Sequence, residues 1–549
     1  MKTKLLPITL IASAMLLGSC SLIRNVAEGI LGGQTSTSEE QSSSSSSSSS
    51  SGHGSSSSST STSTSGGGHG SSSSSGSTVE EPELEQEVFN EAGKGNGWSS
   101  ASGTAITSPR AQADYTILVY LCGSNLESYD SQYGEWGSMA SRNLLEMMEV
   151  GIPSNVNVVI ETGGAKRNSN KSSWNNTLLS QHQSGLSIKD KALERWHIEN
   201  HRLVKDEEVS TYSGMGLQTT FSSFIEYGTT RFPAKKTGVV MWDHGGAMMG
   251  CCQDENTNDM LTPFEMDAAL DSALGSSKLE WIGYDCCLMN VADIASLNSE
   301  HFNYMVASQE TEPGEGWDYN GWLDNVVANV NISTSSLLNE ICDTYVQKCG
   351  DNYNAYGNYY IAYGNYMTAN NITDEDGYTG ADYVQAGQQY LNYNDATLSV
   401  LDLSKMAAFD SAWNALGSSM QSKISSQTNW DTFSSNVLEN SLRFGGDEGY
   451  WGDMSYDYDV FDAEDVINGI KSKYSLSVTS VTSAMSQLIT HNSYGQSYTG
   501  SNTPCGLCVY LACENSASQF GVTSSNAIYS NWFTLYNQYG GNSSGGWGW

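Results

Sequence analysis

A histidine and a cysteine each follow a short apolar run, and this pair of residue types could carry out nucleophilic catalysis. His244 follows the run 239–242 and stands beside Gly245, and Cys287 follows the run 281–284. Apolar runs of this length predict buried β-strands. A cysteine thiolate is a strong nucleophile, and a histidine within reach can take up the thiol proton. The two residues are therefore candidates for a nucleophile and its general base.

The environment expected around Cys287 strengthens this interpretation. The spacing of Val291, Ile294 and Leu297 predicts a helix directly after the strand, so Cys287 is expected near a helix N-terminus. The dipole of a helix favours thiolate over thiol at such a position. Taken singly, each residue is weak evidence, because a cysteine after a strand is usually a small core residue and a lone histidine is usually structural. Their place at neighbouring strand ends makes a catalytic dyad the prediction.

The elements that must position these residues alternate between apolar runs and segments of helical periodicity. Strands are predicted at 115–121, 156–160, 238–242, 279–284 and 304–307, and helices at 138–149, 217–227 and 263–274. This alternation predicts an α/β fold with a mostly parallel sheet and helices on its faces. Catalytic groups in such folds lie on loops beyond the carboxyl ends of strands.

The chain after residue 349 has a different composition, rich in Tyr, Asn and Gly. It contains helical segments at 404–416 and 462–474 and a strand candidate at 506–511. We expect a second lobe, or a C-terminal α/β elaboration, packed on the first. Its tyrosines could form a sugar-binding surface, although aromatic side chains more often fill cores.

The N-terminal residues predict export and a lipid anchor. Basic residues precede an apolar run at 5–17, which is shorter than a membrane span and is followed by Gly18-Ser19-Cys20. Residues 1–20 are therefore expected to be a bacterial lipoprotein signal peptide that ends at a lipidated Cys20 in the cell envelope or at the cell surface. An ordinary secretory signal with a chance cysteine is the alternative. Residues 21–113, dominated by Ser and Gly, predict a disordered stalk.

Charge and cysteine content narrow the class of protein. Sixty acidic residues against twenty-four basic ones give a net charge of −36 and a pI near 4.3. Nucleic acid and anionic lipid would be repelled, so neither is expected as a partner, and the acidity is interpreted as a source of solubility. Eleven cysteines are few for a disulfide framework in 549 residues, and we expect at least one thiol to stay free.

Four segments together resemble one known family, the clostripain-like cysteine peptidases. They are Trp242–Gly246, Asp285–Met289, Ser308–Trp317 and Tyr120–Glu127. The similarity extends from about residue 114 to residue 322, and more loosely through 458–462 to 506–510. The resemblance implies a caspase-like α/β fold and an endopeptidase that cleaves polypeptides after Arg or Lys.

The resemblance also implies a role for each residue of the site. The nucleophile of the family stands directly before Leu-Met, which selects Cys287 over Cys286, and its histidine is His244. The expected reaction forms a thioester acyl-enzyme, with the backbone N–H groups of Gly245 and Cys287 stabilising the oxyanion. Asp285 matches the acidic residue that holds the substrate's Arg or Lys side chain. Its alternative role is the N-cap of the following helix.

Maturation and domain boundaries follow from the same resemblance. Relatives cut themselves after a basic residue between the histidine and cysteine motifs, but this chain has no Lys or Arg between Lys236 and Lys278. Self-cleavage in that segment is therefore not expected. The predicted units are a catalytic domain at 114–349 and an aromatic-rich C-terminal part of the peptidase at 350–549.

One acidic loop could bind calcium. Asp254, Asn256, Asn258 and Glu265 occupy the first, third, fifth and twelfth positions of a calcium loop, but the glycine required at the sixth position is absent. A solvated acidic loop is the alternative interpretation. Calcium dependence is known in the family, so the resemblance keeps calcium as a hypothesis, and we expect no other cofactor.

The sequence also allows a second class of function. A surface lipoprotein could keep the fold without activity and use its aromatic-rich second half to bind glycan or protein. The presence of both His244 and Cys287 favours the enzyme, because a binding protein has no need of the pair.

Overall fold

The computed structural model describes residue 82 and residues 103–128, 138–166, 173–209, 212–374, 377–391, 393–445, 458–500, 502–513 and 517–540. The predicted signal peptide, Cys20 and most of the predicted stalk lie outside these ranges. Within them, no helix is long and apolar enough to cross a membrane.

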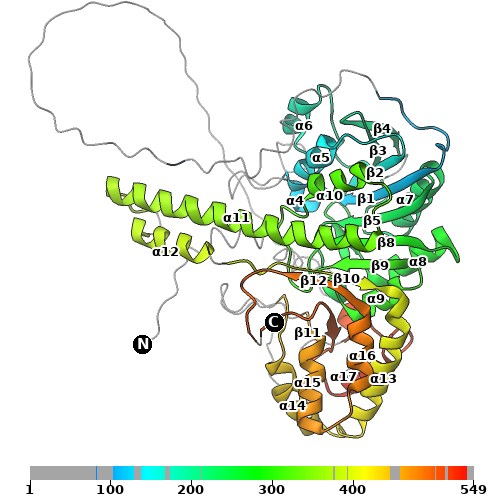
Figure 1. Cartoon of the computed structure of the whole chain (residues 1–549), viewed down its shortest axis with the longest axis vertical. Helices are drawn as coiled ribbons and strands as arrows, with labels where there is room; N and C mark the ends of the chain where they lie inside the picture. The colour runs from blue at the N-terminus through cyan, green and yellow to red at the C-terminus, as the bar shows by residue number, and fades with distance from the viewer. Residues whose placement is uncertain are drawn as a thin grey trace, which may run out of the picture.

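A nine-stranded sheet forms the centre of the molecule, in the order β12-β10-β9-β8-β5-β1-β2-β3-β4 (Figure 1). Its five central strands are parallel: β1 (Ala113–Cys122), β2 (Val156–Gly163), β5 (Ala234–Trp242), β8 (Leu279–Asp285) and β9 (Phe302–Ala307). Antiparallel strands flank them, β3 (Glu194–Glu199) and β4 (Arg202–Glu208) on one side and β10 (Thr397–Asp402) and β12 (Ile489–Tyr494) on the other. The predicted strands are confirmed.

Two hydrophobic cores lie on opposite faces of the sheet, because successive side chains of a strand point to opposite sides. In β1, Leu118 and Tyr120 belong to one core, and Ile117 and Val119 belong to the other. The first core is covered by α7 (Gln218–Arg231), α8 (Pro263–Leu274), α9 (Ala292–Asn298) and α13 (Met406–Gln421). The second is covered by α5 (Met139–Glu149), α10 (Tyr319–Ala328) and α11 (Thr334–Asn370). The predicted α/β fold with helices on both faces is confirmed.

The C-terminal part both completes the sheet and builds a second lobe. β10 and β12 join the main sheet, and the predicted boundary at residue 349 falls within α11. The lobe at the bottom of Figure 1 contains α13 together with α14 (Gln427–Asn436), α15 (Ala463–Tyr474), α16 (Thr479–Leu488), α17 (Ser530–Tyr539) and a small sheet of β11 (Val460–Asp462) and β13 (Cys508–Tyr510).

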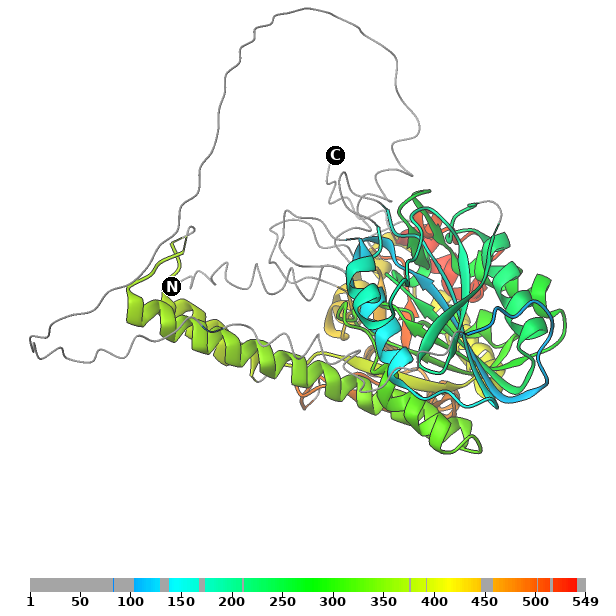
Figure 2. The same ribbon diagram turned by 90° about the horizontal axis from the view of Figure 1, so that it is seen from above.

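The tyrosine-rich segment forms an arm that projects from the body, built by the end of α11 and the antiparallel α12 (Gly380–Tyr390) (Figure 2). Tyr353, Tyr360, Tyr383 and Tyr390 are buried between the two helices, where their rings contact one another. Much of the aromatic content therefore forms a core of the arm.

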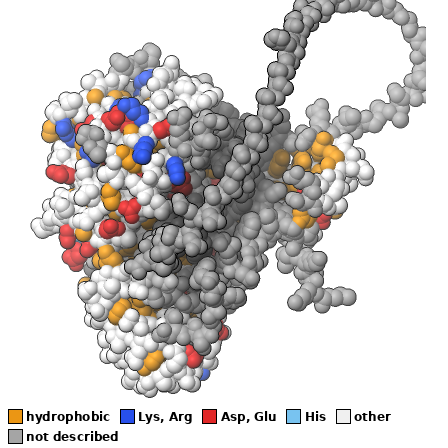
Figure 3. Space-filling view, turned by 180° about the vertical axis from the view of Figure 1, so that it is seen from behind, with side chains coloured by type: hydrophobic (Ala, Val, Ile, Leu, Met, Phe, Trp, Pro, Cys, Tyr) orange, Lys and Arg blue, Asp and Glu red, His pale blue; other side chains and the backbone are white. Residues whose placement is uncertain are grey.

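Surface charge is mixed on the face of the molecule seen in Figure 3. Lys and Arg side chains lie mostly in the upper part of this face, among acidic and hydrophobic ones, and its lower part shows mostly uncharged side chains with a few acidic ones.

Candidate active site

The carboxyl ends of β5 and β8 lie side by side, which brings the two predicted loops together. The strands pair in parallel with Trp242 opposite Asp285, and the N–H of Asp243 donates to the Asp285 carbonyl at 3.3 Å. His244 follows β5 and Cys287 follows β8, so both residues lie at the same edge of the sheet.

Gly245 fixes the spacing between these loops. A Cβ at this position would lie 2.2 Å from the carbonyl oxygen of Cys287 and 2.9 Å from its nitrogen. Contacts this short with backbone atoms cannot be relieved by rotating a side chain, so only glycine fits. The residue next to His244 therefore packs directly on the backbone of Cys287.

The Cys287 thiol is buried against residues 308–316, named here the 308–316 loop. The N–H of Glu312 donates to Sγ at 3.2 Å, and the Glu312 carbonyl oxygen lies 3.7 Å from the same atom. Leu288, the next residue, has a φ of +64°, a conformation that costs a non-glycine residue roughly 1–2 kcal/mol. Strain of this kind gathers at functional sites, and here it turns the chain sharply after the candidate nucleophile.

The helix after the cysteine begins later than predicted. α9 starts at Ala292, and its N-cap is Val291 in an extended conformation. The effect of a helix dipole is confined to the first turn, so it does not activate the Cys287 thiol. Asp285 is likewise not an N-cap. The predicted place of Cys287 at the helix N-terminus was wrong, and the alternative role of Asp285 does not apply, because a left-handed residue and an extended residue separate the cysteine from the helix.

His244 is fully buried and held by one side chain. Its Nε2 lies 2.6 Å from Oδ1 of Asn125. Because an amide oxygen only accepts, this orientation of the amide assigns the proton to Nε2 and leaves the lone pair on Nδ1. Burial lowers the pKa of His244 to about 3, so the ring is neutral at physiological pH. A neutral imidazole is the form that can accept a proton.

Asn125 is a residue of the site whose role was not predicted from the sequence. This residue lies in the short helix α4 (Ser124–Glu127), directly after β1, which pairs with β5. Asn125 therefore follows its strand as His244 follows β5, at the same edge of the sheet. A polar residue after the strand candidate 115–121 was the available signal.

Asp285 lines a pocket beside Cys287. The walls of this narrow pocket include Trp242, Glu312 and Gly316. Burial raises the pKa of Asp285 to about 6, although hydrogen bonds from neighbouring groups oppose the rise. The carboxyl is therefore mostly ionised above about pH 6 and can bind a cation there.

Cys286 has different partners from its neighbour. Its Sγ lies 3.4 Å from the carbonyl oxygen of Met241, and burial raises its pKa well above the usual value. The ten cysteines in the described ranges are free thiols, which agrees with the expectation of unpaired cysteine.

The predicted calcium residues do not fit a calcium ion. The Asp254 carboxylate accepts three backbone N–H groups, and Glu265 closes a capping box with Thr262 at the start of α8. Asn256 and Asn258 lie in the turn between β6 (Cys251–Asp254) and β7 (Asp259–Leu261). In the part of the chain that the structure describes, no group of three or more His, Cys, Asp or Glu side chains could hold a metal ion. The loop is a hairpin turn held by its own hydrogen bonds.

Solved structures similar to this chain are peptidases. An inactive zymogen of a C11 protease from Parabacteroides distasonis is 14% identical, with 77% of this chain and 99% of that chain covered and a TM-score of 0.49. A secreted C11 cysteine protease from Bacteroides thetaiotaomicron, in complex with an irreversible peptide inhibitor, is 16% identical, with 78% and 99% covered and a TM-score of 0.48. No curated protein gives a significant match.

The family model of the clostripain family matches residues 119–544, which is most of the chain and includes the strands and loops of the candidate site. The protein therefore belongs to the clostripain family and is a cysteine-type endopeptidase.

Proposed function

We propose that this peptidase cleaves polypeptides after Arg or Lys, with Cys287 as nucleophile and His244 as general base. The observation that carries the proposal is the place of Asp285, whose buried carboxyl lines the pocket that Cys287 also lines. A carboxylate in such a pocket selects a cationic side chain.

The proposed chemistry is acyl transfer. Nδ1 of His244 takes the thiol proton, Cys287 Sγ attacks the scissile carbonyl carbon, and the imidazolium then protonates the leaving amine. Asn125 holds the ring by accepting from Nε2, as observed at 2.6 Å. Water attacks the thioester in the second half of the reaction and releases the carboxylic acid.

We assign the oxyanion site to the backbone N–H groups of Gly245 and Cys287. The close packing of Gly245 on the backbone of Cys287 supports this assignment, because it gathers the two amides in one place. Cys286 is the less suitable nucleophile, since burial raises its pKa and its thiol lies at the Met241 carbonyl.

A second carboxyl makes the pocket suitable for a basic side chain, since Glu312 lines it with Asp285. Burial raises the pKa of both carboxyls, and a cation bound in the pocket would favour their ionised forms.

The experiment is a cleavage assay of the mature chain on peptides that differ only in the residue before the cut: Arg, Lys, Gln or Leu. His244→Ala and Cys287→Ala should abolish cleavage, and Cys286→Ala should keep it. Activity lost in Cys286→Ala but kept in Cys287→Ala would reassign the nucleophile. A parent protein inert on all four peptides would favour the catalytically silent binding protein.

We also propose that the peptidase is exported and anchored through a lipid on Cys20, with residues 21–113 as the stalk below a catalytic unit that starts near residue 114. The support is the apolar run at 5–17 and the Gly18-Ser19-Cys20 sequence after it. Metabolic labelling with a fatty acid should mark the parent protein and leave Cys20→Ser unmarked. Equal labelling of both proteins would exclude this anchor.

A further inference from the structure

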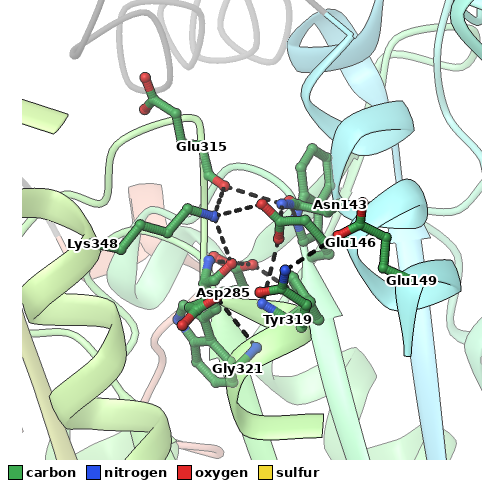
Figure 4. Close-up of polar contacts among 12 residues, drawn as sticks. Asn143, Glu146, Glu149, Asp285, Glu315, Tyr319, Gly321 and Lys348 are labelled. Atoms are coloured by element: carbon green, nitrogen blue, oxygen red, sulfur yellow. Dashed lines mark hydrogen bonds and ion pairs between the residues drawn. The ribbon is translucent and has the colours of Figure 1, made fainter. Parts of the chain in front are cut away.

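The pocket lined by Asp285 and Cys287 is named here the specificity pocket. Lys348 is a largely buried cation on α11 that binds backbone carbonyls beside this pocket (Figure 4). Its Nζ lies 3.0 Å from Oε1 of Glu146 and donates to the carbonyl oxygens of Glu315 at 3.2 Å and Trp317 at 2.9 Å. One ammonium group thus joins α5, α11 and the end of the 308–316 loop.

The backbone held by Lys348 is the backbone that contacts Asp285. The N–H of Trp317 donates to Oδ2 of Asp285 at 3.2 Å, and the Tyr319 hydroxyl donates to the same oxygen at 2.8 Å. Gly316 lies between the two carbonyls that Lys348 binds and has a φ of +62°. A Cβ on Gly316 would lie 2.7 Å from Oδ2 of Asp285. A small displacement of residues 315–317 would therefore change the surroundings of the Asp285 carboxyl.

Other contacts hold the same segment from both helices. The side-chain amide of Asn143 on α5 donates to the Glu315 carbonyl at 3.1 Å, and the Tyr356 hydroxyl on α11 donates to Oε1 of Glu315 at 3.3 Å. Burial opposes the charge of Lys348, but Glu146, Asp318 and Asp285 raise its pKa above the usual value. The ammonium group therefore stays charged throughout the pH range of an assay.

We propose that Lys348, anchored by Glu146, is a positioning residue for the specificity pocket: it holds the carbonyls of Glu315 and Trp317 and so fixes Asp285 for the basic side chain of the substrate. This inference rests on the proposed function, because it assigns the pocket to Arg or Lys. Lys348 contacts protein groups around the pocket, and the substrate contact belongs to Asp285.

Charge alone makes the opposite prediction, which gives the proposal a clear test. A cation next to an acidic pocket repels a cationic substrate, so removing it without moving the backbone would strengthen binding and lower KM. If Lys348 acts by positioning, its removal loosens residues 315–317 and raises KM.

The experiment compares Lys348→Met, which keeps the apolar stem, with Glu146→Gln and with the control Lys235→Met. Lys235 pairs with Asp114 on the surface and lies near the start of β5, at the end of the strand away from the site. Lys348→Met should raise KM for Arg and Lys peptides about tenfold or more with kcat changed less than about threefold. Glu146→Gln should act in the same direction, and the control should match the parent. The rate of alkylation of Cys287 by iodoacetamide should not change.

A KM that falls or stays constant in Lys348→Met overturns the proposal. A KM that rises by the same factor on peptides with a neutral residue before the cut also overturns it. If Lys348→Met does not fold, the KM of Glu146→Gln decides, and an unchanged value overturns it. Hydrogen exchange at the amides of residues 312–319 separates this proposal from the proposed function, because it needs no substrate. Exchange about tenfold faster in the folded variants supports the positioning role of Lys348 even if the parent cleaves no basic peptide. Unchanged exchange rejects this role.

Discussion

Replacing Asp285 with Asn should separate substrate recognition from folding. The amide keeps an oxygen that can accept from the Tyr319 hydroxyl and the Trp317 N–H, but it removes the charge that would pair with the substrate. Truncating one partner of a buried charge pair costs about 2–5 kcal/mol. The kcat/KM for Arg and Lys peptides should therefore fall about 30- to 5000-fold, and cleavage after a neutral residue should change little.

The same substitution should stabilise the folded protein at pH 7. Burial raises the pKa of Asp285 from 3.8 to about 6, so ionising this carboxyl costs the folded state ~3 kcal/mol relative to the unfolded chain. Because the folded-state pKa is the higher one, stability falls as pH rises from about 4 to about 6, and the full cost is present at pH 7. Asp285→Asn should raise the free energy of unfolding by ~1–3 kcal/mol at pH 7 and by much less at pH 4.

The assays are kcat/KM on basic and neutral peptides between pH 4.5 and 8, and urea unfolding at pH 4 and pH 7. On basic peptides the parent should lose kcat/KM below pH 6, about tenfold at pH 5, and Asp285→Asn should lack this acid limb. Equal losses on basic and neutral peptides would refute the reasoning. So would an Asn variant that unfolds more easily than the parent at pH 7.

Two further substitutions test other parts of the site, and a third tests the predicted calcium loop. Asn125→Ala should lower kcat about 10- to 100-fold with little change in KM, because the His244 ring loses the acceptor at Nε2; a kcat equal to that of the parent would remove Asn125 from the mechanism. Gly245→Ala should destabilise the protein by ~1–3 kcal/mol and abolish cleavage, because its Cβ would overlap the Cys287 carbonyl; an active, stable variant in cleavage and thermal-melting assays would contradict the packing. Glu265→Gln should leave any response of Tm to calcium as it is in the parent, because the Glu265 side chain caps α8. A response to calcium that is lost only in the variant would support calcium binding by this loop.

The central sheet and several helices were predictable because their signals are local. Parallel strands buried on both faces appear as apolar runs, as in β5 and β8. The predicted helix 263–274 coincides with α8 because Pro263 opens its first turn and Thr262 and Glu265 close a capping box. The flanking strands β3, β4, β10 and β12 were not predicted, since charged and polar side chains interrupt their apolar pattern.

Part of the site was predicted because some of its signals are also local in the sequence. His244 and Cys287 could be assigned because each follows its own strand, whereas the contact of Asn125 with His244 spans 119 residues and depends on the pairing of β1 with β5. The start of α9 was missed because apolar spacing shows that a helix exists but not where it begins. The arm was not recognised as helix, since Gly, Asn and Tyr favour helix weakly and α11 is stabilised there by packing on α12.

The most direct test of the central claim is covalent labelling of the mature protein with a peptidyl acyloxymethyl ketone that carries Lys at the reactive position, followed by mass spectrometry of the modified peptide. The label should appear on Cys287 in the parent, should be absent in Cys287→Ala, and should form at least about tenfold more slowly in Asp285→Asn. A label on Cys286, or equal labelling by an analogue with a neutral residue in place of Lys, would contradict the assignment of nucleophile and pocket.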